Sequence, residues 1–213
     1  GGNKASVTGN GKVIMETVTA GNIYGGGNEA SVEGNTSLDL KSVTATDSVF
    51  GGGNNGMVYG NTDTYLHNSS VGGSAYAGGN GVTATVYGNN VIDVDGTTSV
   101  TGHLFGGGNA AKTGCEENVV VDGNTICQAN HSYSKVNVAG ATIGGNVYGG
   151  ANTSVVYGET FVNIGKDMIS GNLTKDNIHI GGTVFGGGEA NAAGSEDYDF
   201  NFISVTRGIN INI

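Results

Sequence analysis

The fold is decided by Val49-Phe50-Gly51-Gly52-Gly53-Asn54, a stretch that has near copies along the whole chain. Each copy places an aromatic residue before a glycine-rich turn, and the six aromatic residues are Tyr24, Phe50, Tyr76, Phe105, Tyr148 and Phe185. They follow one another at spacings of 26, 26, 29, 43 and 37 residues. A phrase that recurs along the chain, at first every 26 residues, indicates a repeat architecture.

A second phrase lies between these aromatic residues. It reads Gly-Asn or Gly-Glu and precedes a run of alternating apolar and polar residues, as in Gly88-Asn89 before Val91-Ile92-Asp93-Val94. Its fifth copy is read at Val121-Asp122-Gly123-Asn124. A third run leads back to the aromatic residue. Each repeat therefore contains three short segments of period two, rich in Val, Ile and Thr, which is the pattern of β-strands.

The resulting prediction is an all-β chain. Residues 1–213 are expected to form a single domain. It would be a parallel β-helix, that is, a three-faced β-solenoid of about seven to eight coils of ~26 residues. Essentially no helix is expected, because no segment shows a 3.6-residue apolar period with caps. Crossovers between parallel strands of one sheet are usually right-handed, so right-handed coils are expected.

Composition narrows the class of protein. Glycine accounts for 42 of the 213 residues and proline is absent, which suits strands joined by tight corners. The net charge is −10 with only eight Lys plus Arg, so nucleic acids and anionic membrane surfaces are disfavoured as partners. No run of 18 apolar residues exists, so membrane insertion of this segment is not expected. Because the chain begins within a repeat, at Gly1-Gly2-Asn3, it is expected to be a fragment of a longer array.

The repeated aromatic residues are expected to stack as a ladder. The residue before each of them is apolar, so strict alternation points that residue inward and the ring outward. A corner would break the alternation and bury the rings, but outward rings are the favoured interpretation. The glycines that follow supply either positive φ or tight packing at a corner. The next position predicts a second ladder, formed by Asn3, Asn28, Asn54, Asn80, Asn109 and Asn152.

Two repeats are enlarged, with insertions at about 110–134 and 165–177. In the first, the extra residues are expected at both ends of a strand over residues 119–123. Insertions on one face of a solenoid often form its binding face, with a tolerated surface loop as an equal alternative. The candidate ligand residues in these loops are Glu116, Glu117, His131, Tyr133, Lys166, Asp167 and Asp176. Cys115 and Cys127 flank the same strand and are predicted to form a disulfide, with two free thiols as the alternative.

No catalytic residues, metal site or cofactor are predicted. The acidic residues at outward or corner positions are Asp39, Asp63, Asp93 and Asp95. They lack the Gly-Gly-x-Gly-x-Asp phrase of calcium-binding β-rolls and are interpreted as a solvated face. An enzyme would need convergent titratable groups, and no spacing forces two of them together. A second, partial aromatic ladder is expected outside the core, formed by Tyr59, Tyr87 and Tyr157. A structural role is favoured for it over a glycan platform.

The phrases VFGGGN and VxGNTxVxV resemble the Gly/Asn-rich β-solenoid repeats of large secreted or surface bacterial proteins of the adhesin type. The resemblance covers about residues 1–190 and carries over no catalytic or ligand residue. It implies a structural scaffold outside the cell, a stalk or filament shaft whose partners are neighbouring copies, joined end to end or side by side. The alternative is a carbohydrate-binding or carbohydrate-cleaving β-helix that uses the inserted loops to hold host or bacterial glycans.

Overall fold

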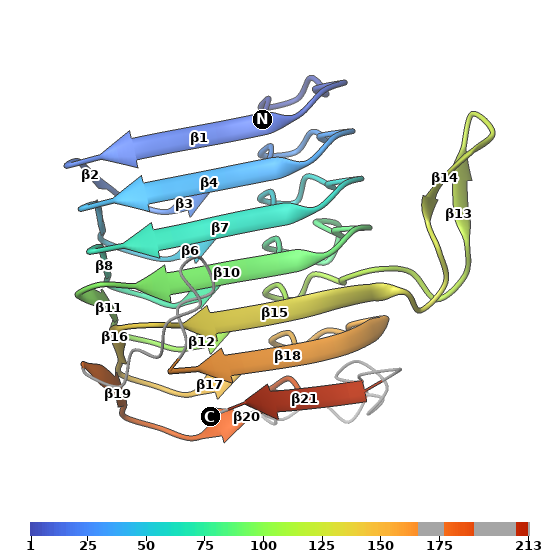
Figure 1. Ribbon diagram of the computed structural model, residues 1–213. Helices are drawn as coiled ribbons and strands as arrows, with labels where there is room; N and C mark the ends of the chain where they lie inside the picture. Colours follow the sequence, from blue (N-terminus) through green and yellow to red (C-terminus); the bar gives the residue numbers. More distant parts are fainter. Residues whose placement is uncertain (166–176, 190–207, 213) are drawn as a thin grey trace, which may run out of the picture.

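The computed structural model describes residues 1–165, 177–189 and 208–212. Its parallel strands stack into a β-solenoid of about six turns with three sheets, and no helix occurs among the described residues (Figure 1). The prediction of an all-β, three-faced solenoid is therefore confirmed. No helix in this part of the chain is long and apolar enough to cross a membrane.

The largest sheet has seven strands: β1 (Gly11–Glu16), β4 (Thr36–Lys41), β7 (Thr62–His67), β10 (Asn90–Asp95), β15 (Ser132–Val138), β18 (Gly158–Ile164) and β21 (Gly208–Asn212). The second sheet contains β2 (Thr19–Ala20), β5 (Thr44–Ala45), β8 (Ser70–Val71), β11 (Thr98–Val100), β16 (Ala141–Ile143) and β19 (Ile178–Ile180). The third contains β3 (Ile23–Tyr24), β6 (Val49–Phe50), β9 (Ala75–Tyr76), β12 (Leu104–Phe105), β17 (Val147–Tyr148) and β20 (Val184–Phe185).

The core lies inside the coils, where period-two alternation places one apolar residue of every pair. In β4, for example, Leu38 and Leu40 are buried, and they are in register with Thr64 and Leu66 of β7. Equivalent residues of successive coils therefore lie directly above one another at the strand spacing of about 4.8 Å. This register builds columns of mostly apolar side chains along the axis, with Thr64 as a buried polar member of the column of Leu38.

The six repeated aromatic residues stack in one column, with ring centroids 4.8–5.0 Å apart and interplanar angles of 1–10°. They form a cluster separate from the main core, on the opposite side of their strands. The expectation that the rings face solvent is nevertheless wrong for the middle of the stack. Phe50, Tyr76, Phe105 and Tyr148 are at most 7% exposed, whereas Phe185 at one end is 42% exposed.

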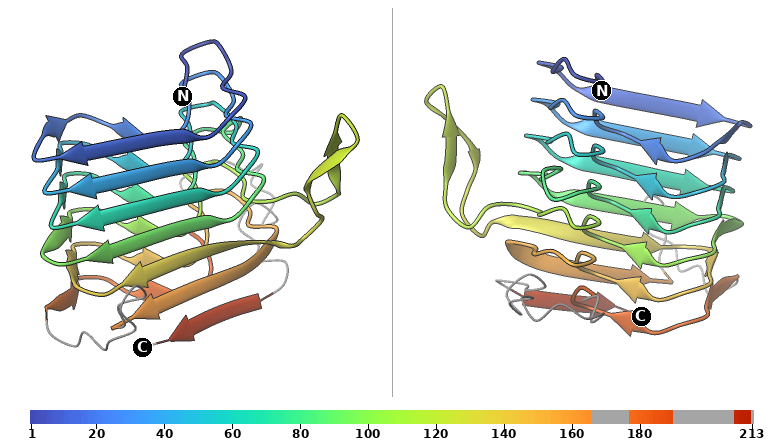
Figure 2. Two further views of the ribbon diagram at one scale, coloured as in Figure 1. Left: turned by 45° about the horizontal axis from the view of Figure 1, so that its top comes forward. Right: turned by 180° about the vertical axis from the view of Figure 1, so that it is seen from behind.

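The rings are buried because the chain after each of them folds into an outer loop. We use this name for the residues between each aromatic strand and the next strand of the large sheet, such as 25–35 and 51–61. Figure 2 shows these loops as a narrow second stack beside the main coils. Burial raises the pKa of Tyr24 and Tyr76, and nearby side chains, Asn80 for Tyr24 and Ser74 and Asn152 for Tyr76, oppose this increase.

The outer loops carry the asparagine ladder. The amide Nδ2 of each asparagine donates to the Oδ1 of the equivalent residue one coil earlier, at 2.7–2.9 Å. The members are Asn3, Asn28, Asn54, Asn80, Asn109 and Asn152. The four inner amides, Asn28, Asn54, Asn80 and Asn109, therefore both donate and accept within the ladder. At the next step Glu189 keeps the backbone bridge with Asn152.

A second asparagine ladder was not predicted. It uses the Gly-Asn phrase at the start of each large-sheet strand, and its members are Asn10, Asn35, Asn61 and Asn89. Each Oδ1 accepts from the backbone N–H of the equivalent residue in the next coil, at 2.8–3.0 Å. The last Oδ1 of the ladder, that of Asn89, accepts from the backbone N–H of Tyr133, near the start of β15.

This register corrects the reading of the fifth repeat. Thr113 bridges Val86 and Val156, so it occupies the place that the sequence assigns to Val121. The residues at 119–123 are not a strand of the shaft. They belong to an antiparallel hairpin of β13 (Val119–Val121) and β14 (Asn124–Cys127), which stands away from the stack in Figure 1.

The turn of this hairpin explains the correction. Asp122 and Gly123 have φ values of 51° and 78°. An Asp-Gly pair with positive φ at both positions is the two-residue turn that joins antiparallel strands. The phrase Gly123-Asn124 thus resembles the repeat in letters but belongs to a different local structure.

Candidate functional site

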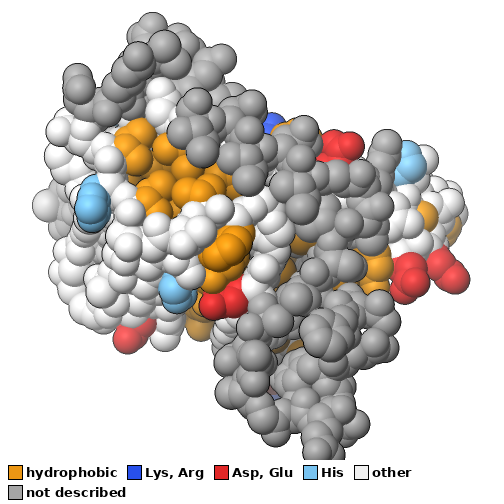
Figure 3. All heavy atoms as spheres, turned by 90° about the horizontal axis from the view of Figure 1, so that it is seen from below, with side chains coloured by type: hydrophobic (Ala, Val, Ile, Leu, Met, Phe, Trp, Pro, Cys, Tyr) orange, Lys and Arg blue, Asp and Glu red, His pale blue; other side chains and the backbone are white. Residues whose placement is uncertain are grey.

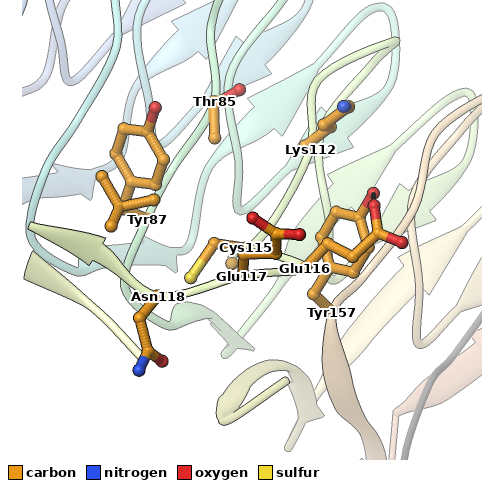
Figure 4. A pocket seen from close by; sticks show the side chains of 10 residues that line it. Thr85, Tyr87, Lys112, Cys115, Glu116, Glu117, Asn118 and Tyr157 are labelled. Atoms are coloured by element: carbon orange, nitrogen blue, oxygen red, sulfur yellow. Dashed lines mark hydrogen bonds between the residues drawn. The ribbon is translucent and has the colours of Figure 1, made fainter. Parts of the chain in front are cut away.

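A groove lies where the hairpin leaves the shaft. Its volume is about 390 Å³, and its walls include Thr85, Tyr87, Lys112, Glu116, Glu117 and Tyr157. Figure 4 shows Tyr87 on one side and Tyr157 with Glu116 on the other, while Cys115 and Glu117 lie between them. The groove therefore combines residues of the outer loops with residues at the base of the hairpin.

The groove exists because one coil lacks a side chain. Tyr87 and Tyr157 each follow a bridged valine, and Gly114 follows the equivalent Thr113 in the coil between them. Gly114 has a φ of 77°, and a Cβ there would meet the side chain of Ser132 at 2.8 Å. The two tyrosines stand two coils apart, about 9.6 Å along the axis at the usual strand spacing, with only glycine between them.

Tyr157 is held in place from two sides. Its hydroxyl group donates a hydrogen bond to Glu116 Oε2 at 3.3 Å, and Lys112 Nζ lies 6.0 Å from its ring centroid. Burial raises the pKa of Tyr157, and the negative charge of Glu116 raises it further. The phenol therefore keeps its proton and remains the donor in this pair.

On the opposite wall Tyr87 packs against Tyr59, with ring centroids 5.7 Å apart and an interplanar angle of 65°. Burial raises the pKa of Tyr87, with a smaller contribution from Tyr59. Tyr59, Tyr87 and Tyr157 thus do not form a continuous second ladder, because the glycine at 114 separates the last from the other two.

The base of the hairpin is closed by the Cys115–Cys127 disulfide, whose Cα atoms lie 6.2 Å apart. Both cysteines are buried, and neither remains as a free thiol. The bridge spans a separation of 12 residues, so it fixes Cys115 and its neighbours Glu116 and Glu117 at the edge of the groove.

A second polar cluster lies on the outer face of the large sheet. Asp39, Asp63 and Asp93 border a hollow of about 170 Å³. Beside it, Asp95 Oδ2 accepts from the hydroxyl group of Tyr65 at 2.8 Å, and Asp95 Oδ1 lies 2.5 Å from His67 Nδ1. Among the described residues no three His, Cys, Asp or Glu side chains are placed so that they could hold a metal ion.

Comparisons with family models, curated proteins and solved structures found no match to this chain.

The candidate ligand residues of the sequence separate into three groups. Glu116 and Glu117 line the groove. His131 is exposed, and its Nδ1 lies 2.6 Å from the carbonyl oxygen of Ala129. The ring centroid of Tyr133 lies 4.9 Å from Lys135 Nζ. Neither His131 nor Tyr133 lines the groove. The remaining three, Lys166, Asp167 and Asp176, lie outside the described residues.

The sequence did not identify several other residues that line the groove, among them Thr85 and Lys112, and it did not place Tyr87 and Tyr157 in its walls. The alignment of the fifth coil with its two neighbours would have indicated these residues. Once Thr113 is aligned with Val86 and Val156, the glycine at 114 marks a missing side chain in the tyrosine column.

Reduction of the disulfide is expected to loosen the hairpin and leave the shaft intact, because the closed loop contains no strand of the three main sheets. Limited proteolysis should cleave within 116–126 faster after addition of reductant, while hydrogen exchange in β7 and β10 stays unchanged. The double variant Cys115→Ala/Cys127→Ala is the control, since it should be cleaved rapidly without reductant. Equal cleavage rates before and after reduction would contradict a bracing role.

Asp93 is expected to make stability depend on pH. Burial raises its pKa; the hydrogen bond from Asn137 and the charge of Lys135 oppose this, and repulsion from Asp63 and Asp95 adds to it. A carboxyl group whose pKa rises on folding stabilises the native state below the unfolded pKa of 3.8, and this stability is lost as pH increases through the folded value.

Asp93→Asn is therefore expected to raise the melting temperature at neutral pH and to flatten its decline as pH rises from about 4. The amide can still accept the hydrogen bond from Asn137. Thermal melts across this range test the prediction, with Asp122→Asn in the exposed hairpin turn as the matched control. Parallel melting curves for Asp93→Asn and the unchanged chain would refute it.

Proposed function

We propose that the chain is a segment of a structural β-solenoid scaffold outside the cell, the stalk or filament shaft of a bacterial surface adhesin. The observation that carries this proposal is the register: six aromatic rings and six asparagine amides repeat at strand spacing without interruption, even across the coil that carries the hairpin. Such continuous ladders resist bending and shear because every coil is bonded to its neighbours on both sides.

Two further features support the proposal. A disulfide forms and persists mainly in oxidising compartments, which fits a secreted or surface location. The net charge of −10 on a chain of 213 residues favours solubility of a long scaffold. The same proposal includes two finer points of architecture: seven to eight coils of ~26 residues in the whole chain, and a right-handed winding of these coils.

The ends of the described stack suggest how a shaft extends. At the last coil Ile178, Ile180 and Val184 are only partly buried, and Figure 3 shows hydrophobic side chains gathered inside the ring of the coil at this end. At the first coil Val13 and Met15 are also partly buried. Further coils or a second copy would cover both surfaces and add strands to the ends of the three described sheets.

Concentration-dependent light scattering and negative-stain microscopy of the full chain test the proposal. We expect particles that lengthen in one dimension with increasing concentration, with the solenoid axis along the particle. Ile180→Lys, which places a charge on the partly buried end, should abolish lengthening, whereas the adjacent exposed substitution His179→Lys should preserve it. A single compact monomer at every concentration would overturn end-to-end assembly.

A further inference from the structure

We propose that the groove between the outer loops and the hairpin binds a neutral sugar residue of a glycan chain, held by Tyr87, Tyr157, Glu116 and Lys112. This inference goes beyond the shaft function and does not depend on it. It assigns a class of ligand to the coil in which the repeat is interrupted, where Gly114 takes the position held by Tyr87 and Tyr157 in the neighbouring coils.

The shape of the groove suits a sugar. Its volume of about 390 Å³ lies within the usual range of small-ligand sites. The two tyrosine rings stand on opposite walls of the groove and are only partly buried (Figure 4). The apolar C–H face of a pyranose ring packs well on an aromatic face and removes both surfaces from water.

The polar groups of the groove match sugar hydroxyl groups. Glu116 lines the groove, and its Oε2 accepts a hydrogen bond from Tyr157, so the carboxylate is an acceptor beside the aromatic ring. Lys112 supplies an ammonium donor on the same wall, and Thr85 adds a hydroxyl group. Carboxylate acceptors and an ammonium donor beside an aromatic face can bind the alternating donors and acceptors of neighbouring hydroxyl groups.

The charge of the groove selects against acidic ligands. Two carboxylates, from Glu116 and Glu117, outweigh the single ammonium group of Lys112, and the whole chain carries a net charge of −10. Uronates, sialic acids and phosphates would be repelled at close range and disfavoured on approach. A neutral hexose or N-acetylhexosamine unit meets no such barrier.

The hairpin holds half of the site. The disulfide links Cys115 to Cys127 next to Glu116 and Glu117, so the acceptor groups are fixed relative to the shaft before any ligand arrives. A preorganised site loses less conformational entropy on binding. This arrangement predicts that opening the disulfide weakens binding even though both tyrosines remain on the shaft.

Saturation-transfer NMR and calorimetry on the full chain test the inference. The neutral probes are maltohexaose, mannohexaose and tri-N-acetyllactosamine; the competing probes are trigalacturonate and tetralysine. We expect binding of at least one neutral probe and none of trigalacturonate. Tyr157→Ala and Tyr87→Ala should each weaken that binding about tenfold or more, because each removes one aromatic face.

Controls separate a groove effect from unfolding. Tyr133→Ala removes a partly buried tyrosine outside the groove and should bind as the unchanged chain does. Glu116→Gln keeps the size of the side chain and should weaken binding less than either alanine variant. Melting curves of all variants report whether the solenoid remains folded. Addition of reductant should weaken binding by the unchanged chain. It should have no effect on binding by Cys115→Ala/Cys127→Ala, which has no disulfide to reduce.

Three results would overturn the inference: no neutral probe binds, tetralysine or trigalacturonate binds more tightly than every neutral probe, or Tyr157→Ala and Tyr133→Ala have the same affinity. None of these affects the shaft proposal, which is tested by assembly. Conversely, Ile180→Lys should bind the sugar at full affinity as a monomer, so the two proposals can fail separately.

Discussion

Replacing Phe105 with alanine is expected to lower the free energy of unfolding by about 3–5 kcal/mol. The ring is fully buried, and it stacks on Tyr76 and Tyr148 at centroid distances of 4.8 Å on both sides. Its removal leaves a cavity between two rings that cannot move together, because their coils are held apart by strand pairing. Urea denaturation followed by circular dichroism measures the loss.

The same substitution at the end of the column serves as its control. Phe185 stacks on Tyr148 at 5.0 Å and is 42% exposed, so Phe185→Ala should cost no more than about 1.5 kcal/mol. Hydrogen exchange should show the damage of Phe105→Ala centred on β9, β12 and β17, because each coil of a solenoid contacts only its neighbours. Equal losses at both positions would mean that the column contributes little beyond surface burial.

The burial of this column marks the limit of what alternation predicts. Period two correctly assigns Leu104 and Phe105 to opposite sides of their strand. It cannot reveal what lies beyond the strand, since that depends on the path of the chain after the glycines. The outer loop folds back beside the rings, which form a buried cluster apart from the main core (Figure 2).

The candidate site was harder to predict than the fold, for a related reason. Letter-by-letter matching placed the fifth Gly-Asn phrase at Gly123-Asn124, whereas the bridges of Thr113 place the true coil earlier. The spacing of the repeats supplies the strands and ladders because each depends on one repeated contact. The groove depends on a single departure from the repeat, and only the three-dimensional register shows that Gly114 stands between two tyrosines.

The sequence left open whether the glycine triplets are needed for a positive φ or for tight packing at a corner. None of their glycines is among those with positive φ. The first and third places tolerate alanine, at Ala77 and Ala151, but the second is glycine in all six copies. At five of these six places a Cβ would lie only 2.6–2.8 Å from an atom of the next coil, so the close approach of successive coils leaves no room for a side chain there; at Gly187 a Cβ meets nothing within 4 Å.

Gly52→Ala is accordingly expected to destabilise the solenoid by about 3 kcal/mol or more, at the upper end of the usual cost of overpacking. A Cβ at this position would lie 2.8 Å from both the Cα and the backbone nitrogen of Gly79. Carbon atoms normally pack at about 3.5–4.0 Å. Backbone cannot yield as a flexible side chain does, so the coils at Gly52 and Gly79 must separate and stretch the hydrogen bond from the N–H of Gly52 to Gly78, now 3.0 Å.

Gly9→Ala is the matched control, because a Cβ there meets nothing within 4 Å. It should change the free energy of unfolding by less than about 0.5 kcal/mol, as substitutions at open surface positions usually do. Urea denaturation of both variants, with amide exchange measured at Gly52 and its neighbours, distinguishes a local loss of coil contact from general instability. If Gly52→Ala were as stable as Gly9→Ala, the spacing between outer loops would have to be adjustable, and the six second-place glycines would need another explanation.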